Sequence, residues 1–223
     1  MKNNEITFDY PQIEKLKIKT RDYIFKAQYK KAEQYLLRQR KKYPNHLFIQ
    51  STLAAIKYEV AFYKDDKIMQ KEFAKAAKRL KNLLKSNSNI REEDGYRNLN
   101  EYYWFSQQYK KQYLLGVSKI KLKSKRGYYS QGVGATHYAA QLKSEGKDRD
   151  SYLWAKRAEK AWLHYFKHIT KTYYDPWAWY ALSLGLQGKA AAMEKAIQKS
   201  AQLSLRSVKH PFFKKVRRLA QVD

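Results

Sequence analysis

Apolar residues recur along this chain at intervals of three and four, the spacing that places side chains on one face of an α-helix. The pattern is clearest in residues 12–27, after Pro11, and in residues 30–42, before Pro44. Proline suits the first turn of a helix and disfavours helical geometry in the residue before it. No stretch alternates apolar and polar residues convincingly over several strands. The sequence therefore predicts an all-α protein.

The same spacing predicts further helices, separated by the few glycines, prolines and polar turns of the chain. Short turns join successive helices, so we expect about four helical hairpins and a terminal helix that caps them. We predict a single domain over residues 1–223, with a possible internal joint near residues 86–90, in and beside the polar stretch SNSN. The further helices are expected at 46–63, at 66–85, within 90–123, at 128–145, at 150–169, after Asp175-Pro176 and at 211–222.

The first and last hairpins resemble tetratricopeptide (TPR) repeats. In the first, Ala32 falls on the small residue of the family's second helix, Leu36 on its large apolar position and Tyr23 on the tyrosine of its first helix. In the last, Trp177 falls on the family's tryptophan and Ala181 on its small residue. Pro44 matches the family's final proline, and Gly188 matches its turn glycine. Other positions depart from the family pattern: Leu16 for tryptophan, Lys19-Thr20 for Leu-Gly, Ala27 at the turn, Gln39 and Met193 at small positions, and Leu184 for tyrosine.

The resemblance implies a TPR-like α-solenoid, in which each hairpin buries the apolar face of its neighbour. TPR arrays usually bind peptides or other proteins. The resemblance therefore implies a non-enzymatic scaffold that mediates protein–protein interaction.

The charge of the chain restricts the class of partner. The 47 lysines and arginines exceed the 20 aspartates and glutamates, which gives a formal charge of +27. Such an excess attracts polyanions. No carboxylate occurs from Tyr102 to Ser144, or from Lys195 to Val222. The candidate partners are an acidic protein, nucleic acid and an anionic membrane face. We expect an acidic protein, with nucleic acid as the alternative, while a coding bias toward lysine is the competing explanation of the charge.

Two basic segments are the candidate contacts. The first reads KIKLKSKRGYY and is expected to be a helix end followed by a linker; the second lies within residues 206–218. Nucleic-acid binders stack bases on aromatic rings and hold phosphates with basic residues, although helix packing explains most individual tyrosines more simply. The candidate residues are Lys119, Lys121, Lys123, Lys125, Arg126, Tyr128, Tyr129, Lys214, Lys215, Arg217 and Arg218.

Patterns for catalysis or metal binding are weak. His164 and His168 share a helix face, but a third ligand is not evident. The acidic residues 92–94 suit a helix start, where they complement the helix dipole. Residues 132–134 (Gly-Val-Gly) lack the strand and third glycine of a phosphate loop, so we expect these glycines to let two helices approach. We predict no catalytic residue, no cofactor and no metal; an enzyme whose site is assembled from distant residues is the third alternative.

No segment of the sequence indicates insertion into a membrane. The first residues lack the apolar region of a secretory signal, and no run approaches the 18 apolar residues of a spanning helix. Cysteine is absent, which suits a reducing compartment. We expect a soluble, cytoplasmic protein.

Overall fold

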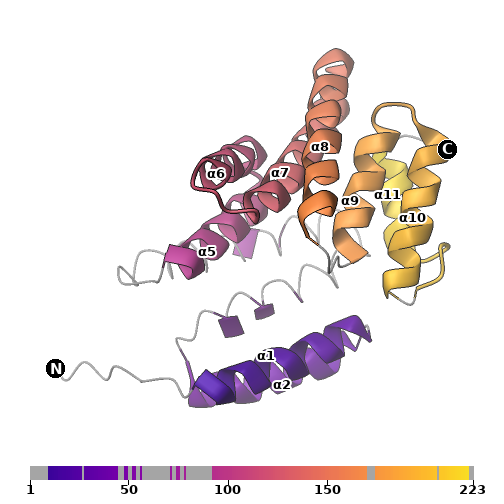
Figure 1. Cartoon of the computed structure of the whole chain (residues 1–223). Helices are drawn as coiled ribbons and strands as arrows, with labels where there is room; N and C mark the ends of the chain where they lie inside the picture. Colours follow the sequence, from indigo (N-terminus) through magenta and orange to yellow (C-terminus); the bar gives the residue numbers. More distant parts are fainter. Residues whose placement is uncertain are drawn as a thin grey trace. The chain divides into compact units, whose positions relative to one another are not determined.

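The computed structural model describes residues 10–26, 28–44, 48–49, 52–53, 56, 71, 74–75, 78, 92–169, 174–204 and 206–220. The regular structure of these residues is helical throughout, which confirms the all-α prediction. The chain divides into two compact units, Met1–Val60 and Ala61–Asp223 (Figure 1). The joint predicted near residues 86–90 lies outside the described residues.

The first unit contains α1 (Tyr10–Phe25) and α2 (Tyr29–Lys42), close to the ranges predicted for the first hairpin. Thr20, which stands where TPR repeats have glycine, is fully buried. Its Oγ1 donates a hydrogen bond of 2.8 Å to the Leu16 carbonyl, so the buried hydroxyl is satisfied. The core of the unit consists of Leu16, Ala32, Leu36, Phe48, Ile49, Leu53 and Ile56.

The described helices of the second unit run in sequence from α5 to α11. Helix α7 contacts α6 and α8, while α9 contacts α7, α8, α10 and α11 (Figure 1). Each helix from α6 to α10 therefore packs against the helix before it, whereas α11 packs on α9. The segment predicted within 90–123 is two helices. The bounds are α5 Glu92–Phe105, α6 Tyr109–Lys121, α7 Gly127–Ser144, α8 Asp148–His168, α9 Tyr174–Gly185, α10 Ala190–Ser204 and α11 Pro211–Ala220.

The hairpins α1–α2, α5–α6, α7–α8 and α9–α10 share one turn geometry. In each, the residue before the second helix donates its N–H to the carbonyl five residues earlier and accepts the N–H four residues later. The first of these bonds measures 2.8 Å at Gln28, 2.8 Å at Gln108, 2.9 Å at Lys147 and 3.1 Å at Lys189. The bond to the fifth preceding carbonyl is that of the Schellman motif, which satisfies a free carbonyl at the end of the first helix.

In two hairpins a hydrogen bond joins residues twelve positions apart in sequence, Asn100 with Gln112 and Ala139 with Ser151. The other two hairpins have residues with the same separation at the equivalent positions. The pairs are Thr20 with Ala32, Asn100 with Gln112, Ala139 with Ser151, and Ala181 with Met193; except for the partly buried Asn100, all are buried. The polar pair is hydrogen-bonded, because Gln112 Nε2 donates to Asn100 Oδ1 over 3.1 Å. In the α7–α8 hairpin, Ser151 Oγ donates to the Ala139 carbonyl over 2.9 Å, so this short side chain is also satisfied at the contact.

Glycines let α7 approach α6 and α8. A Cβ on Gly134 would lie 2.5 Å from the Tyr113 nitrogen and 2.7 Å from the Tyr109 carbonyl oxygen. A Cβ on Gly132 would lie 2.5 Å from the indole of Trp162 on α8. The expectation that these two glycines allow helices to approach is confirmed.

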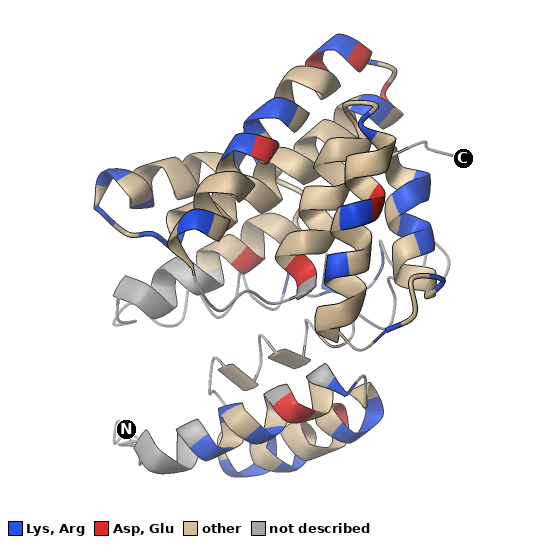
Figure 2. Ribbon diagram, turned by 45° about the vertical axis from the view of Figure 1, so that its right-hand side comes forward, with Lys and Arg blue, Asp and Glu red and all other residues tan. Residues whose placement is uncertain are grey.

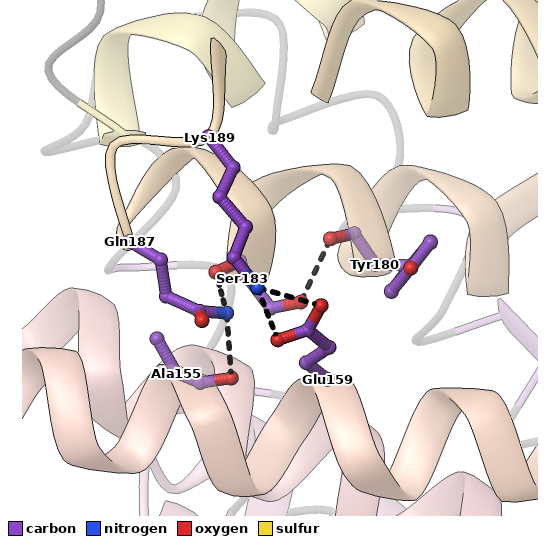
Figure 3. A network of polar contacts seen from close by, with 6 residues as sticks. All are labelled: Ala155, Glu159, Tyr180, Ser183, Gln187 and Lys189. Carbon is purple, nitrogen blue, oxygen red and sulfur yellow. Dashed lines mark hydrogen bonds and ion pairs between the residues drawn. The ribbon is translucent and has the colours of Figure 1, made fainter. Parts of the chain in front are cut away.

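A polar network joins α8 to α9 and to the turn that follows it (Figure 3). Lys189 Nζ lies 2.8 and 2.7 Å from the two carboxylate oxygens of Glu159. Gln187 Nε2 donates to the Ala155 carbonyl over 3.3 Å and to the Ser183 carbonyl over 3.0 Å. The α9–α10 turn is therefore held against the preceding hairpin by side chains as well as by apolar packing.

The terminal helix α11 packs its apolar face against the last hairpin, as the sequence predicted. The Phe212 ring lies 5.6 Å from the Trp179 ring on α9, measured between centroids. A Cβ added to Gly185 of α9 would lie only 2.5 Å from the Cβ of Ala220 on α11. Helix α11 thus covers part of α9.

Candidate polyanion-binding surface

The loop between α6 and α7 carries the densest basic segment of the sequence. Helix α6 ends in a Schellman motif, in which the Lys123 N–H bonds the Ile120 carbonyl (2.8 Å) and the Ser124 N–H bonds the Lys119 carbonyl (3.0 Å). Lys123 adopts the left-handed conformation of this motif, with φ of 61°. The predicted helix end and linker are therefore confirmed, and the loop backbone is fixed by hydrogen bonds.

Three lysines of this loop are exposed to solvent: Lys121, Lys123 and Lys125. Within the described part of the chain they form no ion pair. Lys119 is half-buried, and Arg126 is exposed at the residue before α7; both make other contacts. The three exposed lysines thus form a local concentration of uncompensated charge, because a carboxylate is absent from the whole stretch between Glu101 and Glu145.

Most described carboxylates of the second unit are already paired inside it, and none of these pairs involves the α6–α7 loop. Basic positions far outnumber acidic ones on its ribbon (Figure 2). The ion pairs are Lys143–Asp148 at 3.0 Å, Lys147–Glu145 at 2.7 Å, Lys189–Glu159 at 2.7 Å and Arg217–Glu194 at 2.6 Å.

The two tyrosines that follow the loop have different surroundings. Tyr128 is half-buried, and its ring stacks on His164 (5.3 Å) and His168 (5.6 Å) of α8. Tyr129 contacts Trp162 edge-on, with centroids 5.8 Å apart. Tyr128 is therefore the aromatic residue at the margin of the basic loop, whereas Tyr129 belongs to the packing between helices.

The Tyr129 hydroxyl donates a short hydrogen bond of 2.6 Å to Asp175 Oδ2 at the start of α9. Burial raises the pKa of the Asp175 carboxyl to about 6, although the bond from Tyr129 acts in the opposite direction. Burial, reinforced by the Asp175 charge, raises the pKa of the Tyr129 hydroxyl. The pair is an internal polar contact, and Tyr129 is not presented to a partner at this surface.

The basic residues of α11 are only partly available. Arg217 bonds both carboxylate oxygens of Glu194 at 2.6 Å each, and also donates to the Val208 carbonyl. Lys215 is buried. Lys214 and Arg218 are exposed, and Arg218 makes a further contact. The C-terminal segment therefore offers less free charge than its sequence indicates.

The histidine pair on α8 shares a helix face, as expected from its spacing, and both rings are covered by Tyr128. Within the described residues, three or more His, Cys, Asp or Glu side chains nowhere gather in a group that could hold a metal ion. The acidic residues 92–94 lie at the start of α5, which is the position that complements a helix dipole.

Sequence reasoning missed His137, which lies in an aromatic cluster contributed by four helices. Its ring stacks on Tyr109 of α6 at 5.2 Å and meets Trp179 of α9 at 4.6 Å and Trp104 of α5 at 5.9 Å. Nε2 has no hydrogen-bond partner among the described residues. Burial lowers the pKa of His137 from 6.5 to about 3, so the imidazole is a neutral packing group.

Comparisons with known proteins found no protein family that matches this sequence and no match among curated proteins. Among the helices that the structure describes, none has the length and apolar character needed to cross a bilayer.

Proposed function

We propose that the chain is a non-enzymatic helical-repeat scaffold of the TPR type, located in the cytoplasm, whose basic surface binds an acidic partner protein. Among the described residues, four hairpins share one turn geometry, which supports the repeat interpretation because repeated units use equivalent local contacts. The closely packed helices leave the outer face of α8 as an extended surface for a partner.

The exposed face of α8 is the observation that carries this proposal. Lys156, Lys160 and Lys167 are exposed, together with Leu153 and Leu163, at the spacing of one helix face. Between Asp150 and Asp175 the only carboxylate is Glu159, which Lys189 pairs. A partner segment with alternating acidic and leucine side chains would match both features, because it gains ion pairs and buries apolar surface.

Binding of a fluorescent, helix-forming peptide rich in Glu and Leu tests this proposal. We expect Lys156→Gln/Lys160→Gln to weaken binding of this peptide by about tenfold, at roughly 1 kcal/mol or less per rim charge. Lys195→Gln/Lys199→Gln on α10 is the matched control, because both lysines are exposed, and should change affinity less than twofold. Equal affinities of the wild-type and α8 variants would refute the proposal.

The alternative function is nucleic-acid binding through both basic segments, 119–126 and 206–218. It has less support than the scaffold function. Arg217 is engaged by Glu194, and Lys215 is buried, so the second segment has few charges to offer phosphates. Of these two segments, the α6–α7 loop keeps more exposed lysines without an ion pair to described residues, namely Lys121, Lys123 and Lys125.

A further inference from the structure

We propose that the α6–α7 loop docks on an anionic lipid bilayer, with Leu122 inserted into the membrane interface and the flanking lysines on the lipid headgroups. The proposal goes beyond the scaffold function and does not depend on it, since it uses the loop and not the face of α8. Residues 121–125 are called the basic tip below.

Leu122 is the most exposed large apolar side chain in the described part of the chain. It is 67% exposed and follows directly on the last residue of α6. Leu114 on α6 is also exposed, at 54%. Ile120, by contrast, faces inward against Gly127. An exposed leucine of this kind adds nothing to folding but becomes favourable when hydrocarbon covers it.

Lysines surround this leucine on both sides in the sequence. Lys121, Lys123 and Lys125 are exposed and form no ion pair with described residues. A lysine close to an anionic membrane surface strengthens binding about fivefold. One apolar residue or three lysines alone would bind weakly, but the two kinds of attraction act together, as they do when membrane proteins combine two weak anchors.

The backbone of the basic tip is ordered before any contact is made. The Schellman hydrogen bonds from Lys123 and Ser124 fix the loop, so docking carries little further entropic cost of ordering its backbone. Lys123 occupies a left-handed position that glycine would adopt at lower energy. A lysine at that position is therefore not explained by stability, and its charge beside Leu122 gives it a physical use.

The same lysines could attract nucleic acid, but Leu122 favours lipid. Phosphates and sugars offer no apolar surface to a leucine at the centre of the contact, whereas the acyl region of a bilayer does. The acid-free sequence on either side also removes the repulsion that carboxylates would feel at an anionic membrane.

Sedimentation with vesicles tests the proposal on the full chain. We expect binding to phosphatidylcholine vesicles that contain about 30% phosphatidylglycerol, and almost none to phosphatidylcholine alone. Leu122→Gln, which keeps the charge, should weaken binding by about three- to tenfold. Lys121→Gln/Lys123→Gln/Lys125→Gln should weaken it by about 100-fold. Circular dichroism should show that each variant keeps the helical content of the wild type.

Ile18→Gln is the matched control for Leu122→Gln. Ile18 is 63% exposed on α1 and also lies between two lysines, but Asp22 follows one turn later. We expect less than a twofold change in vesicle binding. The proposal is overturned if the wild type does not distinguish the two kinds of vesicle, or if Leu122→Gln binds as the wild type does. It is also overturned if the chain ignores anionic vesicles but binds polyuridylic acid through the same three lysines.

Discussion

Among the described residues, Gln107 and Lys123 adopt the left-handed backbone conformation without being glycine. Gln107 (φ 56°) ends α5 and Lys123 (φ 61°) ends α6, at positions equivalent to Gly146 and Gly188 in the other turns. The Cβ of an L-residue crowds the following carbonyl in this conformation, which costs about 1 kcal/mol or more. The chain therefore keeps two helix ends that are less stable than they could be.

We predict that Gln107→Gly and Lys123→Gly each raise the free energy of unfolding by about 0.5–1 kcal/mol. The free energy gained by removing the left-handed strain exceeds the free-energy cost of the more flexible unfolded chain. Urea denaturation would measure both changes. The two variants should differ in vesicle binding: Gln107→Gly should bind as the wild type does, and Lys123→Gly more weakly. Destabilisation by either glycine would contradict the account of these turns.

His137 is a buried titratable group whose surroundings are aromatic. The rings of Trp104, Tyr109 and Trp179 face it, and burial also raises the pKa of Tyr109, so neither group is charged near neutral pH. Because burial lowers the pKa of His137 from 6.5 to about 3, the unfolded chain binds a proton below pH 6.5 that the folded chain does not bind. Stability contributed by neutral His137 is therefore lost as the pH falls from 6.5 toward 3.

We predict that wild-type stability falls relative to His137→Gln by roughly 1 kcal/mol per pH unit as the pH falls from 6.5 toward about 4. Urea unfolding of both proteins at pH 7 and at about pH 5 would measure the difference. Asp175 acts in the opposite direction, because burial raises its pKa to about 6, but it is present in both proteins and cancels. A pH-independent difference would show that His137 is accessible to protons in the folded chain.

At the scale of helices, the close approach of α7 to α6 depends on the absence of a single side-chain atom, the Cβ that glycine lacks. Glycine at position 134 brings α7 against the backbone of α6, where a Cβ would meet Tyr113 at 2.5 Å and Tyr109 at 2.7 Å. Backbone atoms cannot rotate away as a flexible side chain can. The crossing can therefore accept a methyl group only if a whole helix moves.

We predict that Gly134→Ala lowers the free energy of unfolding by about 1–3 kcal/mol, although alanine is the better helix former by about 1 kcal/mol. Ala140→Gly on the same helix is the control, because it changes helix propensity in the opposite sense, and should cost only about 1 kcal/mol. Thermal unfolding of both variants would test the prediction. A more stable Gly134→Ala variant would mean that α6 and α7 are farther apart than described.

At the scale of the whole molecule, the formal charge of +27 acts against compactness. The described carboxylates of the second unit are largely committed to internal pairs, so the exposed lysines repel one another. Salt screens repulsion between exposed charges over distances of about 10 Å at 0.1 M.

We therefore predict that raising sodium chloride from about 20 to about 300 mM increases the Tm by a few degrees. Lys121→Gln/Lys123→Gln/Lys125→Gln removes three of the repelling charges and should show a smaller increase. Differential scanning calorimetry would measure both. A Tm that falls with salt would indicate that the ion pairs contribute more to stability than the repulsion removes.

Within the described part of the chain, the sequence by itself indicated most of the helices and the places where they reverse. Residues 12–27 and 30–42, and the break before Gly127, follow from apolar spacing, prolines and turn residues, all of which act within a few positions along the chain. Ala32 and Ala181, which the sequence places at small positions, are both fully buried. The absence of carboxylates from Tyr102 to Ser144 likewise predicted a basic segment at the end of α6.

Only the tertiary structure decided which neighbouring residues face inward. Tyr128 and Tyr129 are adjacent and identical, yet one stacks on α8 beside the basic loop and the other bonds Asp175, 46 positions away. Arg217 is similarly engaged by Glu194 of α10. Such partners belong to other helices, and their proximity depends on how the hairpins stack. Local spacing fixes the face of a helix, but the neighbour against that face is fixed by packing between distant segments.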